Sequence, residues 1–534
     1  MKTNTIVIIV IAMILVIVYF SIPPLGIYAN DGGTKYIQMK SFYLNHWKRL
    51  DIDYPGQELG LSYSYLNPVR SFKVMDNKLF ITCSPLFTYL TSLVYPFLGD
   101  RGILFFPLLS FFISIILFLK ILDMLLEKCI FYYILVASFL IGSPVYLYSI
   151  IFWEHLPAVC LVMLSLYYIT RYFKKEKSSL DIFLSAFFLG SSLFFRTGMW
   201  ALITGYLSFL SYVFIKKNEF KYIIAMLLGF TVPIAAYFLS NLVFYGHLLG
   251  LHATSHLPYN FSLKKALVSS AILFTGYIVV GLLNKSNDKR SLIKFYYLLN
   301  FILISVLLGL FINSPIRSLV TTFPLIIMIF YGIGENIEEL FSSKPELRHF
   351  LLSTVIIYIS LVTIFLFNNP DTSIRYLLPA VPIALIFIGV ISKEAMVFKP
   401  FYILTALLVI FSFTVNLSEL RKTVLGCKYY NYKRVEFLKE NTKDKDVVIF
   451  QANPLMEHAG PLYFERVYIV SKNNGRDTKD ILDTLKEKGI QYCYYWTMYK
   501  EFKEIFLKDT EYKIDKYEFK VENSPTHYLL RIKL

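Results

Sequence analysis

Long apolar runs separated by short, mostly basic segments dominate the chain up to about residue 420. Each run is near the roughly 20 residues that an α-helix needs to cross a bilayer. The first run extends from Thr5 to Phe20, and later runs are predicted at 102–120, 129–148, 156–171, 180–196, 199–215, 221–241, 266–283, 292–312, 317–334, 350–367, 376–392 and 400–416. The pattern predicts a polytopic α-helical membrane protein with about 13 transmembrane helices.

Basic residues are unevenly divided between alternate loops. Lys2 precedes the first run and places the N-terminus in the cytoplasm, so that residues from about 25 onward are extracytoplasmic. The first run also resembles a cleavable signal peptide, but Pro23–Pro24 is a poor approach to a cleavage site and favours a retained anchor. The predicted inner loops carry most of the basic residues, and the short outer loops hold Arg196, Lys264, Lys265, Arg317 and Arg375.

Two regions depart from the membrane pattern. Residues 25–83 form a long first extracytoplasmic loop, in which lysines among aromatic residues predict helices lying on the membrane surface. After about residue 420, short β-type runs alternate with helical ones. The sequence predicts a transmembrane domain at 1–419 and a small extracytoplasmic α/β domain at 420–534, with strands at 447–450, 467–470, 491–495 and 527–534 and a helix at 478–488.

Composition agrees with a protein whose surface faces lipid. Charged residues make up 17% of the chain, whereas soluble domains carry roughly 25%. The net charge of +16 is spread over short loops, which argues against a nucleic-acid site. None of the five cysteines is spaced as CxxC, so a zinc cluster is not supported, although Cys427 and Cys493 share the C-terminal region and have the option of pairing.

Ionisable residues at the predicted outer helix ends are the functional candidates, because burying a charge is costly without a partner or a function. Asp31 follows the first span in Asn-Asp-Gly-Gly. It is either the residue of a turn or helix N-cap, or a general base held at the membrane surface. The pair Glu154–His155 either caps a helix, orients a substrate hydroxyl or binds a metal ion. The sequence therefore leaves open whether the protein depends on a metal.

Arginines and histidines on the same, extracytoplasmic side of the membrane are further candidates for functional residues. Arg375 at the mouth of a span can clasp a phosphate with paired hydrogen bonds, and Arg317 has a comparable place. Arg196 lies in a short turn where simple snorkelling to the interface is the alternative. The loop around His247 gathers three of the eight histidines. Metal ligation is one interpretation of them, but no acidic residue is adjacent, and an interfacial polar face is the simpler interpretation.

The arrangement of these segments resembles the GT-C superfamily of membrane glycosyltransferases, in particular the protein O-mannosyltransferases and the lipid A aminoarabinose transferases. The resemblance spans nearly all of the membrane portion. Many members carry an acidic pair in the first outer loop, whereas Gly32 follows Asp31 here. The resemblance to the GT-C superfamily is found in five short sequence motifs: Asp31-Gly-Gly-Thr-Lys35-Tyr36, Cys83-Ser84-Pro85-Leu86-Phe87, Trp153-Glu154-His155-Leu156-Pro157, Tyr245-Gly246-His247-Leu248-Leu249-Gly250 and Arg375-Tyr376-Leu377-Leu378-Pro379.

The resemblance implies transfer of a sugar from a polyprenyl-phosphate donor to an acceptor hydroxyl of a lipid, glycan or protein at the extracytoplasmic face of the cytoplasmic membrane, with inversion. Asp31 would act as the general base. The donor phosphate would bind Arg375, Arg196, Lys35 and Arg317. Glu154, His155, Tyr36 and His247 would position donor or acceptor. No cofactor is required by this chemistry, and no nucleic acid takes part.

Three other functions remain open at the level of sequence. A transporter or flippase of an amphipathic lipid-linked substrate also needs many spans, but it does not need a carboxylate in the first outer loop. An O-antigen polymerase or ligase carries its main residues in a large later loop, whereas the longest outer loop here precedes the second span. A non-catalytic sensor or scaffold would not explain why arginines lie at the outer ends of several predicted helices.

Overall fold

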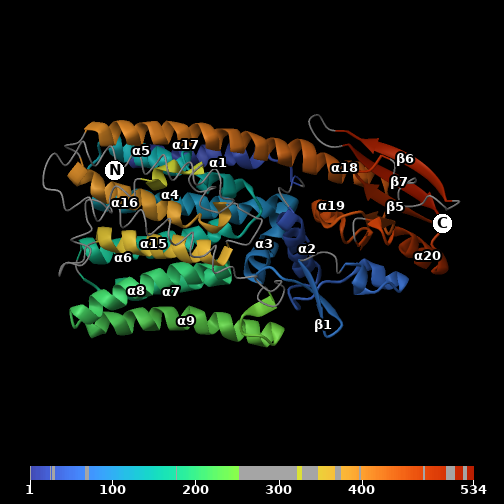
Figure 1. The fold of residues 1–534 in the computed structure, drawn as a ribbon, viewed down its shortest axis with the longest axis horizontal. Helices are drawn as coiled ribbons and strands as arrows, with labels where there is room; N and C mark the ends of the chain where they lie inside the picture. The colour runs from blue at the N-terminus through green and yellow to red at the C-terminus, as the bar shows by residue number, and fades with distance from the viewer. Residues whose placement is uncertain are drawn as a thin grey trace.

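The computed structural model describes residues 2–24, 26, 30–66, 71–175, 177–251, 322–327, 347–366, 374–395, 399–472, 475–500, 512–520 and 526–534. A bundle of long helices occupies one end of the molecule and a β-sheet the other, with α2 and β1 between them (Figure 1). The runs predicted at 266–283 and 292–312, and most of 317–334, lie outside the described residues.

The helices of the bundle follow the apolar runs of the sequence. Their bounds are α1 Lys2–Ser21, α3 Pro85–Leu98, α4 Phe105–Leu125, α5 Ile130–Leu140, α6 His155–Lys174, α7 Ser179–Ser191, α8 Trp200–Lys216, α9 Phe220–Tyr245, α15 Leu347–Leu366, α16 Ala380–Ala395 and α17 Lys399–Leu425. Among the described residues, Pro85–Leu125, His155–Lys174, Thr197–Lys216 and Phe220–Tyr245 are long and apolar enough to cross a bilayer. A fifth span results if α5 and the 3₁₀ helix η4 (Pro144–Ile150), bent by 40°, are taken together.

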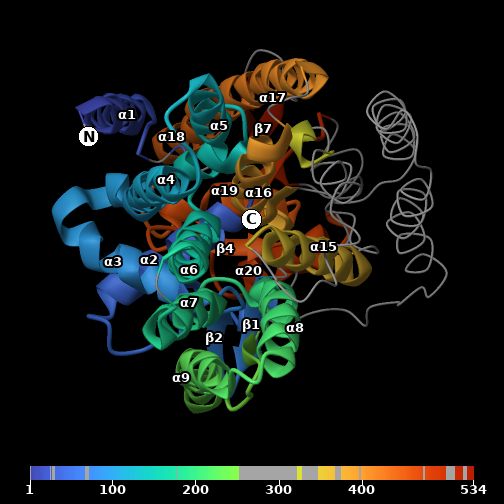
Figure 2. The ribbon, with the colours of Figure 1, turned by 90° about the vertical axis from the view of Figure 1, so that its left-hand side faces the viewer.

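Large apolar side chains are exposed along the outer helices of the bundle. Ile17 on α1 is 65% exposed, Val243 on α9 76% and Ile410 on α17 62%. The three helices lie at the edge of the bundle when it is viewed along its length (Figure 2). Apolar faces of this extent are unfavourable in water and suit the hydrocarbon core of a membrane.

The first loop contains α2 (Asn30–Leu44) and a hairpin of β1 (Phe72–Met75) and β2 (Lys78–Ile81), in which Phe72 pairs with Ile81. Its short 3₁₀ helices are η1 (Pro55–Leu59) and η2 (Tyr63–Tyr65). α2 packs against α3 on one side and α19 (Asn453–His458) on the other, so it is largely covered by protein. The sequence predicted that this segment lies on the membrane surface. In the structure, α2 is instead buried inside the molecule.

The C-terminal α/β unit, residues 432–534, holds a five-stranded sheet in the order β4-β3-β5-β7-β6. β3 is parallel to β4 and β5, whereas β7 is antiparallel to β5 and β6. The strands are β3 Val447–Phe450, β4 Val467–Val470, β5 Tyr492–Thr497, β6 Lys513–Phe519 and β7 His527–Lys533, with helices α18 Tyr432–Asn441, α19 and α20 Thr478–Glu487. Four of these strands lie where the sequence predicts them.

Two large hydrophobic clusters form most of the core of the described residues. One fills the helical bundle. The other joins the C-terminal sheet to the first loop, so that Ile37, Ile52 and Leu79 are buried together with Ile449 and Leu529. The option of a Cys427–Cys493 disulfide is not realised, because both thiols are free and buried, Cys427 in the bundle cluster and Cys493 in the sheet cluster.

Candidate functional site

Asp31 and Arg375 form an ion pair where the bundle meets the first loop. Asp31 lies in the first turn of α2, and Arg375 lies in the short 3₁₀ helix η9, Ile374–Tyr376. The Arg375 Nη1 atom donates to Asp31 Oδ2 over 2.8 Å. The Asp31 side chain remains 40% exposed, so the carboxylate is accessible. Burial alone would raise the pKa of Asp31, but Lys35, Arg375 and Arg196 together hold it below its usual value.

Lys35 stands one helical turn after Asp31 and pairs with Glu154, the residue that precedes α6. The Lys35 Nζ atom lies 2.7 Å from Glu154 Oε2, and the Lys35 side chain is only 4% exposed. Burial would lower the pKa of Lys35, but Glu154, Cys83 and Asp31 raise it overall, so the amine stays charged. Lys35 therefore links the start of α6 to the helix that carries Asp31.

Arg196 reaches the same place from the turn before α8. Its Nη1 atom lies 3.8 Å from Glu154 Oε1 and hydrogen-bonds with His155 Nε2. Its guanidinium lies 5.2 Å from the centre of the Tyr376 ring. The Arg375 guanidinium lies 5.0 Å from the same ring, so the two arginines share one aromatic platform.

The structure thus gathers Asp31, Lys35, Glu154, His155, Arg196 and Arg375 from segments far apart in the sequence. It does not bring Tyr36 or His247 into this network. The Tyr36 hydroxyl donates to Asp100, and exposed His247 accepts from its own loop at Leu249 N. Arg317 lies outside the described residues.

Glu457, at the end of α19, is a site residue that sequence analysis missed. Its side chain is buried, and its Oε1 atom accepts a hydrogen bond of 3.3 Å from Ser71 Oγ. Burial, and then the charge of Asp31, raises the pKa of Glu457 to about 8. No local motif marks this glutamate, and only the packing of α19 on α2 brings it near Asp31.

The residues present do not suit a divalent metal ion. Glu154, the acidic member of the candidate pair Glu154–His155, is already paired with Lys35 and Arg196, and Asp31 is paired with Arg375. These fixed cations would repel an added metal ion. Within the described part of the chain, no group of three or more His, Cys, Asp and Glu side chains is placed to hold a metal.

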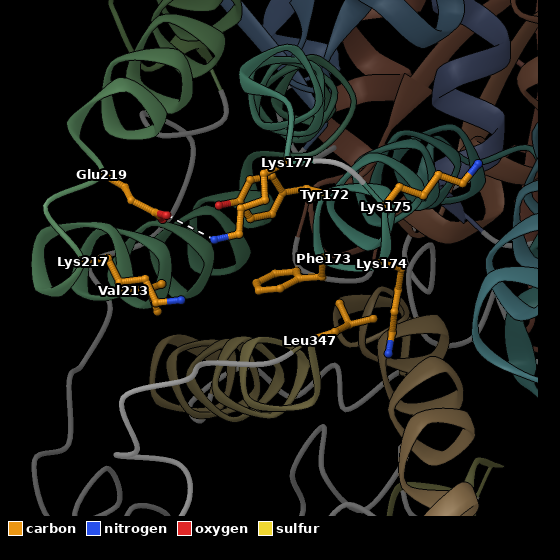
Figure 3. Close-up of a pocket in the computed structure, with 9 residues that line it drawn as sticks. All are labelled: Tyr172, Phe173, Lys174, Lys175, Lys177, Val213, Lys217, Glu219 and Leu347. Atoms are coloured by element: carbon orange, nitrogen blue, oxygen red, sulfur yellow. Dashed lines mark hydrogen bonds and ion pairs between the residues drawn. The ribbon is translucent and has the colours of Figure 1, made fainter.

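A cavity of about 320 Å³ lies at the opposite end of α6 from this site. α6 has 20 residues, which span roughly 30 Å. Lys177 pairs with Glu219 over 3.2 Å, and Lys175 points away from the other side chains (Figure 3). The cavity is lined by Tyr172, Phe173, Lys174, Lys175, Lys177, Val213, Lys217, Glu219 and Leu347. These lysines belong to loops predicted to face the cytoplasm.

No family model and no curated protein matches this sequence. Solved structures do match. ArnT from Cupriavidus metallidurans, solved bound to undecaprenyl phosphate, superposes with a TM-score of 0.54 at 10% identity, over 99% of this chain and 98% of that one. The Archaeoglobus fulgidus oligosaccharyltransferase, solved with Zn and sulfate, superposes with a TM-score of 0.53 at 13% identity, over 92% of this chain and 67% of that one.

The match to ArnT extends over nearly the full length of both chains, so it includes the bundle, the first loop and the C-terminal unit. At these identities, the likeness concerns the fold. The chain therefore shares the fold of ArnT and of the archaeal oligosaccharyltransferase, which is the fold that the resemblance to the GT-C superfamily predicted.

Proposed function

We propose that the protein is a glycosyltransferase that moves a sugar from a polyprenyl-phosphate donor to an acceptor hydroxyl. One observation carries the proposal: a carboxylate, Asp31, lies among the cations Lys35, Arg196 and Arg375 within a GT-C fold. A base for the acceptor and cations for a leaving phosphate are the two requirements of this reaction.

In the proposed reaction, the acceptor oxygen attacks the anomeric carbon of the donor from the side opposite the phosphate. The new C–O bond forms as the bond from the anomeric carbon to the phosphate oxygen breaks, and the configuration inverts. The acceptor proton passes to Asp31, which is ionised because Lys35, Arg375 and Arg196 lower its pKa. The polyprenyl phosphate leaves with the bonding electron pair, and Arg375 and Arg196 stabilise its charge.

The proposal extends to location and topology. The protein would be a multi-pass protein of the cytoplasmic membrane with about 13 spans, its N-terminus in the cytoplasm and the C-terminal α/β unit outside. The ArnT structure was solved with undecaprenyl phosphate, which supports a donor of this chemical class. A donor dissolved in the outer leaflet would reach Arg375 through the membrane rather than through water.

Replacing Asp31 tests the proposal. We expect Asp31→Asn to lower the sugar-transfer rate by at least about 100-fold, because it removes the general base. Binding of a polyprenyl-phosphate sugar should be unchanged or tighter, because Arg375 loses its carboxylate partner. Transfer is measured with a radiolabelled donor in proteoliposomes, and donor binding is measured by filtration.

The matched control is Asp53→Asn. Asp53 lies in the same loop, is 55% exposed and pairs with Arg49 away from the site, so its replacement should leave transfer intact. Full activity of Asp31→Asn would contradict the assigned base. Movement of labelled lipid-linked sugar across the bilayer by the wild-type protein, without transfer, would contradict the enzyme and support a flippase.

A further inference from the structure

A second carboxyl group faces the site from the C-terminal α/β unit. Glu457 is the last but one residue of α19, is 7% exposed and accepts a hydrogen bond from Ser71 of the first loop. A buried glutamate without a cation within ion-pair distance is unusual, because burying a charge is costly. None of the described ion pairs includes Glu457. Its position therefore calls for an explanation other than a salt bridge.

The backbone fixes Glu457 next to Asp31. A Cβ atom at Gly33 would lie 1.5 Å from the Glu457 carbonyl oxygen, and one at Gly460 would lie 2.6 Å from the Gly33 carbonyl oxygen. The two main chains are thus in direct contact two residues beyond Asp31. Only glycine permits this approach, so the Asp-Gly-Gly string serves to seat α19 against the turn that carries the proposed base.

The charged groups around Glu457 decide which of the two acids holds a proton. From α2, the charge of Asp31 raises the pKa of Glu457 and the charge of Lys35 lowers it. The nearby thiol of Cys83, in the turn after β2, stays protonated because burial raises its pKa. On its own helix, His458 hydrogen-bonds with Arg434. Asp31 has three cations in its neighbourhood and stays ionised, whereas burial and the charge of Asp31 raise the pKa of Glu457 to about 8. At neutral pH one acid is a base and the other a hydrogen-bond donor.

We propose that Glu457 is an acceptor-binding residue of this active site, so that the C-terminal α/β unit helps to select the acceptor. This inference rests on the proposed function. The Glu457 carboxylic acid donates a hydrogen bond to a second oxygen of the acceptor, while the attacking hydroxyl donates its proton to Asp31. The chemical class of acceptor that fits is one with two neighbouring oxygens, as in a sugar or another polyol.

The experiment compares Glu457→Gln with Glu457→Ala in acceptor titrations from pH 6 to pH 9.5, with a polyol acceptor that the wild-type enzyme uses. In the wild type, the acceptor KM should rise as the pH passes through about 8, because ionised Glu457 cannot donate. Glutamine donates at every pH, so Glu457→Gln should show a flat KM. Glu457→Ala should raise the acceptor KM about tenfold at pH 7 with a smaller change in kcat.

Two controls keep the result interpretable. Donor binding by both variants checks that they are folded, and Glu436→Gln on the exposed side of α18 should behave as wild type. An unchanged acceptor KM and an unchanged pH profile in both variants would overturn the role of Glu457 while leaving the proposed function in place. Absence of sugar transfer by the wild type would instead overturn the proposed function.

Discussion

The ion pair between Asp31 and Arg375 joins the proposed base to a proposed phosphate ligand. A donor phosphate that binds Arg375 competes with Asp31 for the same guanidinium. Binding of the donor would therefore free the carboxylate and raise its basicity, because one of the cations that lower the pKa of Asp31 becomes neutralised. On the proposed function, donor binding would thus prepare the base for the acceptor.

Removing the Arg375 guanidinium tests this coupling. We expect Arg375→Ala to weaken donor binding at least tenfold, since hydrogen bonds to charged groups contribute about 1.5–3 kcal/mol. Loss of the cation should also raise the pKa of Asp31, which moves the acid limb of the pH–rate profile to higher pH. Both quantities are measured on the same preparation, by donor titration and by transfer rates between pH 4 and pH 8.

Arg49→Ala provides the control for Arg375→Ala, because Arg49 pairs with Asp51 and Asp53 away from the site. Arg375→Lys should retain part of the donor affinity through its charge, though not the paired hydrogen bonds. Donor affinity equal to that of the wild type in Arg375→Ala would exclude this arginine from the phosphate site.

At the residue scale, sequence analysis identified the ionisable groups of the first loop and of the helix ends. Asp31, Glu154 and Arg375 were recognisable because a charge beside an apolar run is costly and therefore informative. Glu457 was not recognisable, since a glutamate in a water-facing α/β region carries no such signal. Its burial arises from tertiary packing against α2, which periodicity within one segment does not encode.

The main-chain contact between α2 and α19 holds Glu457 beside the first turn of α2, which carries Asp31. We expect Gly33→Ala to lower the melting temperature and to abolish most transfer activity, because the added Cβ would collide with the Glu457 carbonyl. Alanine favours a helix over glycine by about 1 kcal/mol, so a gain in stability would show that α19 does not pack here. Thermal unfolding and transfer are the measurements.

Gly102→Ala is the matched control for Gly33→Ala. A Cβ at Gly102 meets its nearest neighbours at 3.7 Å, an ordinary van der Waals contact. This variant should unfold close to the wild-type temperature and retain activity. A comparable loss in both variants would attribute the effect to glycine replacement in general rather than to the contact between α2 and α19.

At the element scale, prediction succeeded where one segment determines its own structure. The apolar runs that the structure describes form helices, and Val447–Phe450 and Val467–Val470 form strands that are buried on both faces. β6 was missed because its residues Lys513–Phe519 are mostly exposed at the sheet edge. α2 was expected at the membrane surface because its amphipathic sequence does not reveal that α19 covers it.

The whole molecule places the proposed active site and the lysine-lined cavity at opposite ends of α6. If the helices cross the bilayer as proposed, residues at the two ends are reached from different compartments. We expect Lys175→Cys to react with a membrane-impermeant maleimide only after cells are opened. Glu436→Cys, in the C-terminal α/β unit, should react in intact cells.

The control for maleimide labelling is the wild-type protein, whose cysteines are buried or partly buried and should give only a low background. Labelling of both positions from the same side would contradict the proposed topology. The distribution of basic residues predicts this sidedness, and the labelling experiment tests it. The sequence did not predict that the first loop and the C-terminal sheet share one hydrophobic core, because this core depends on contacts between residues far apart in the chain.

The shared core of the first loop and the C-terminal sheet has a consequence for biosynthesis. Ile37, Ile52 and Leu79 are buried against strands that are made last, beginning with β3 at Val447. At about 5–20 residues per second, the ribosome needs on the order of 20–70 s to synthesise the intervening chain. On the proposed topology, the first loop would lie outside the membrane without its partner during that interval, and the proposed enzyme would become competent only after its last strand had been translocated.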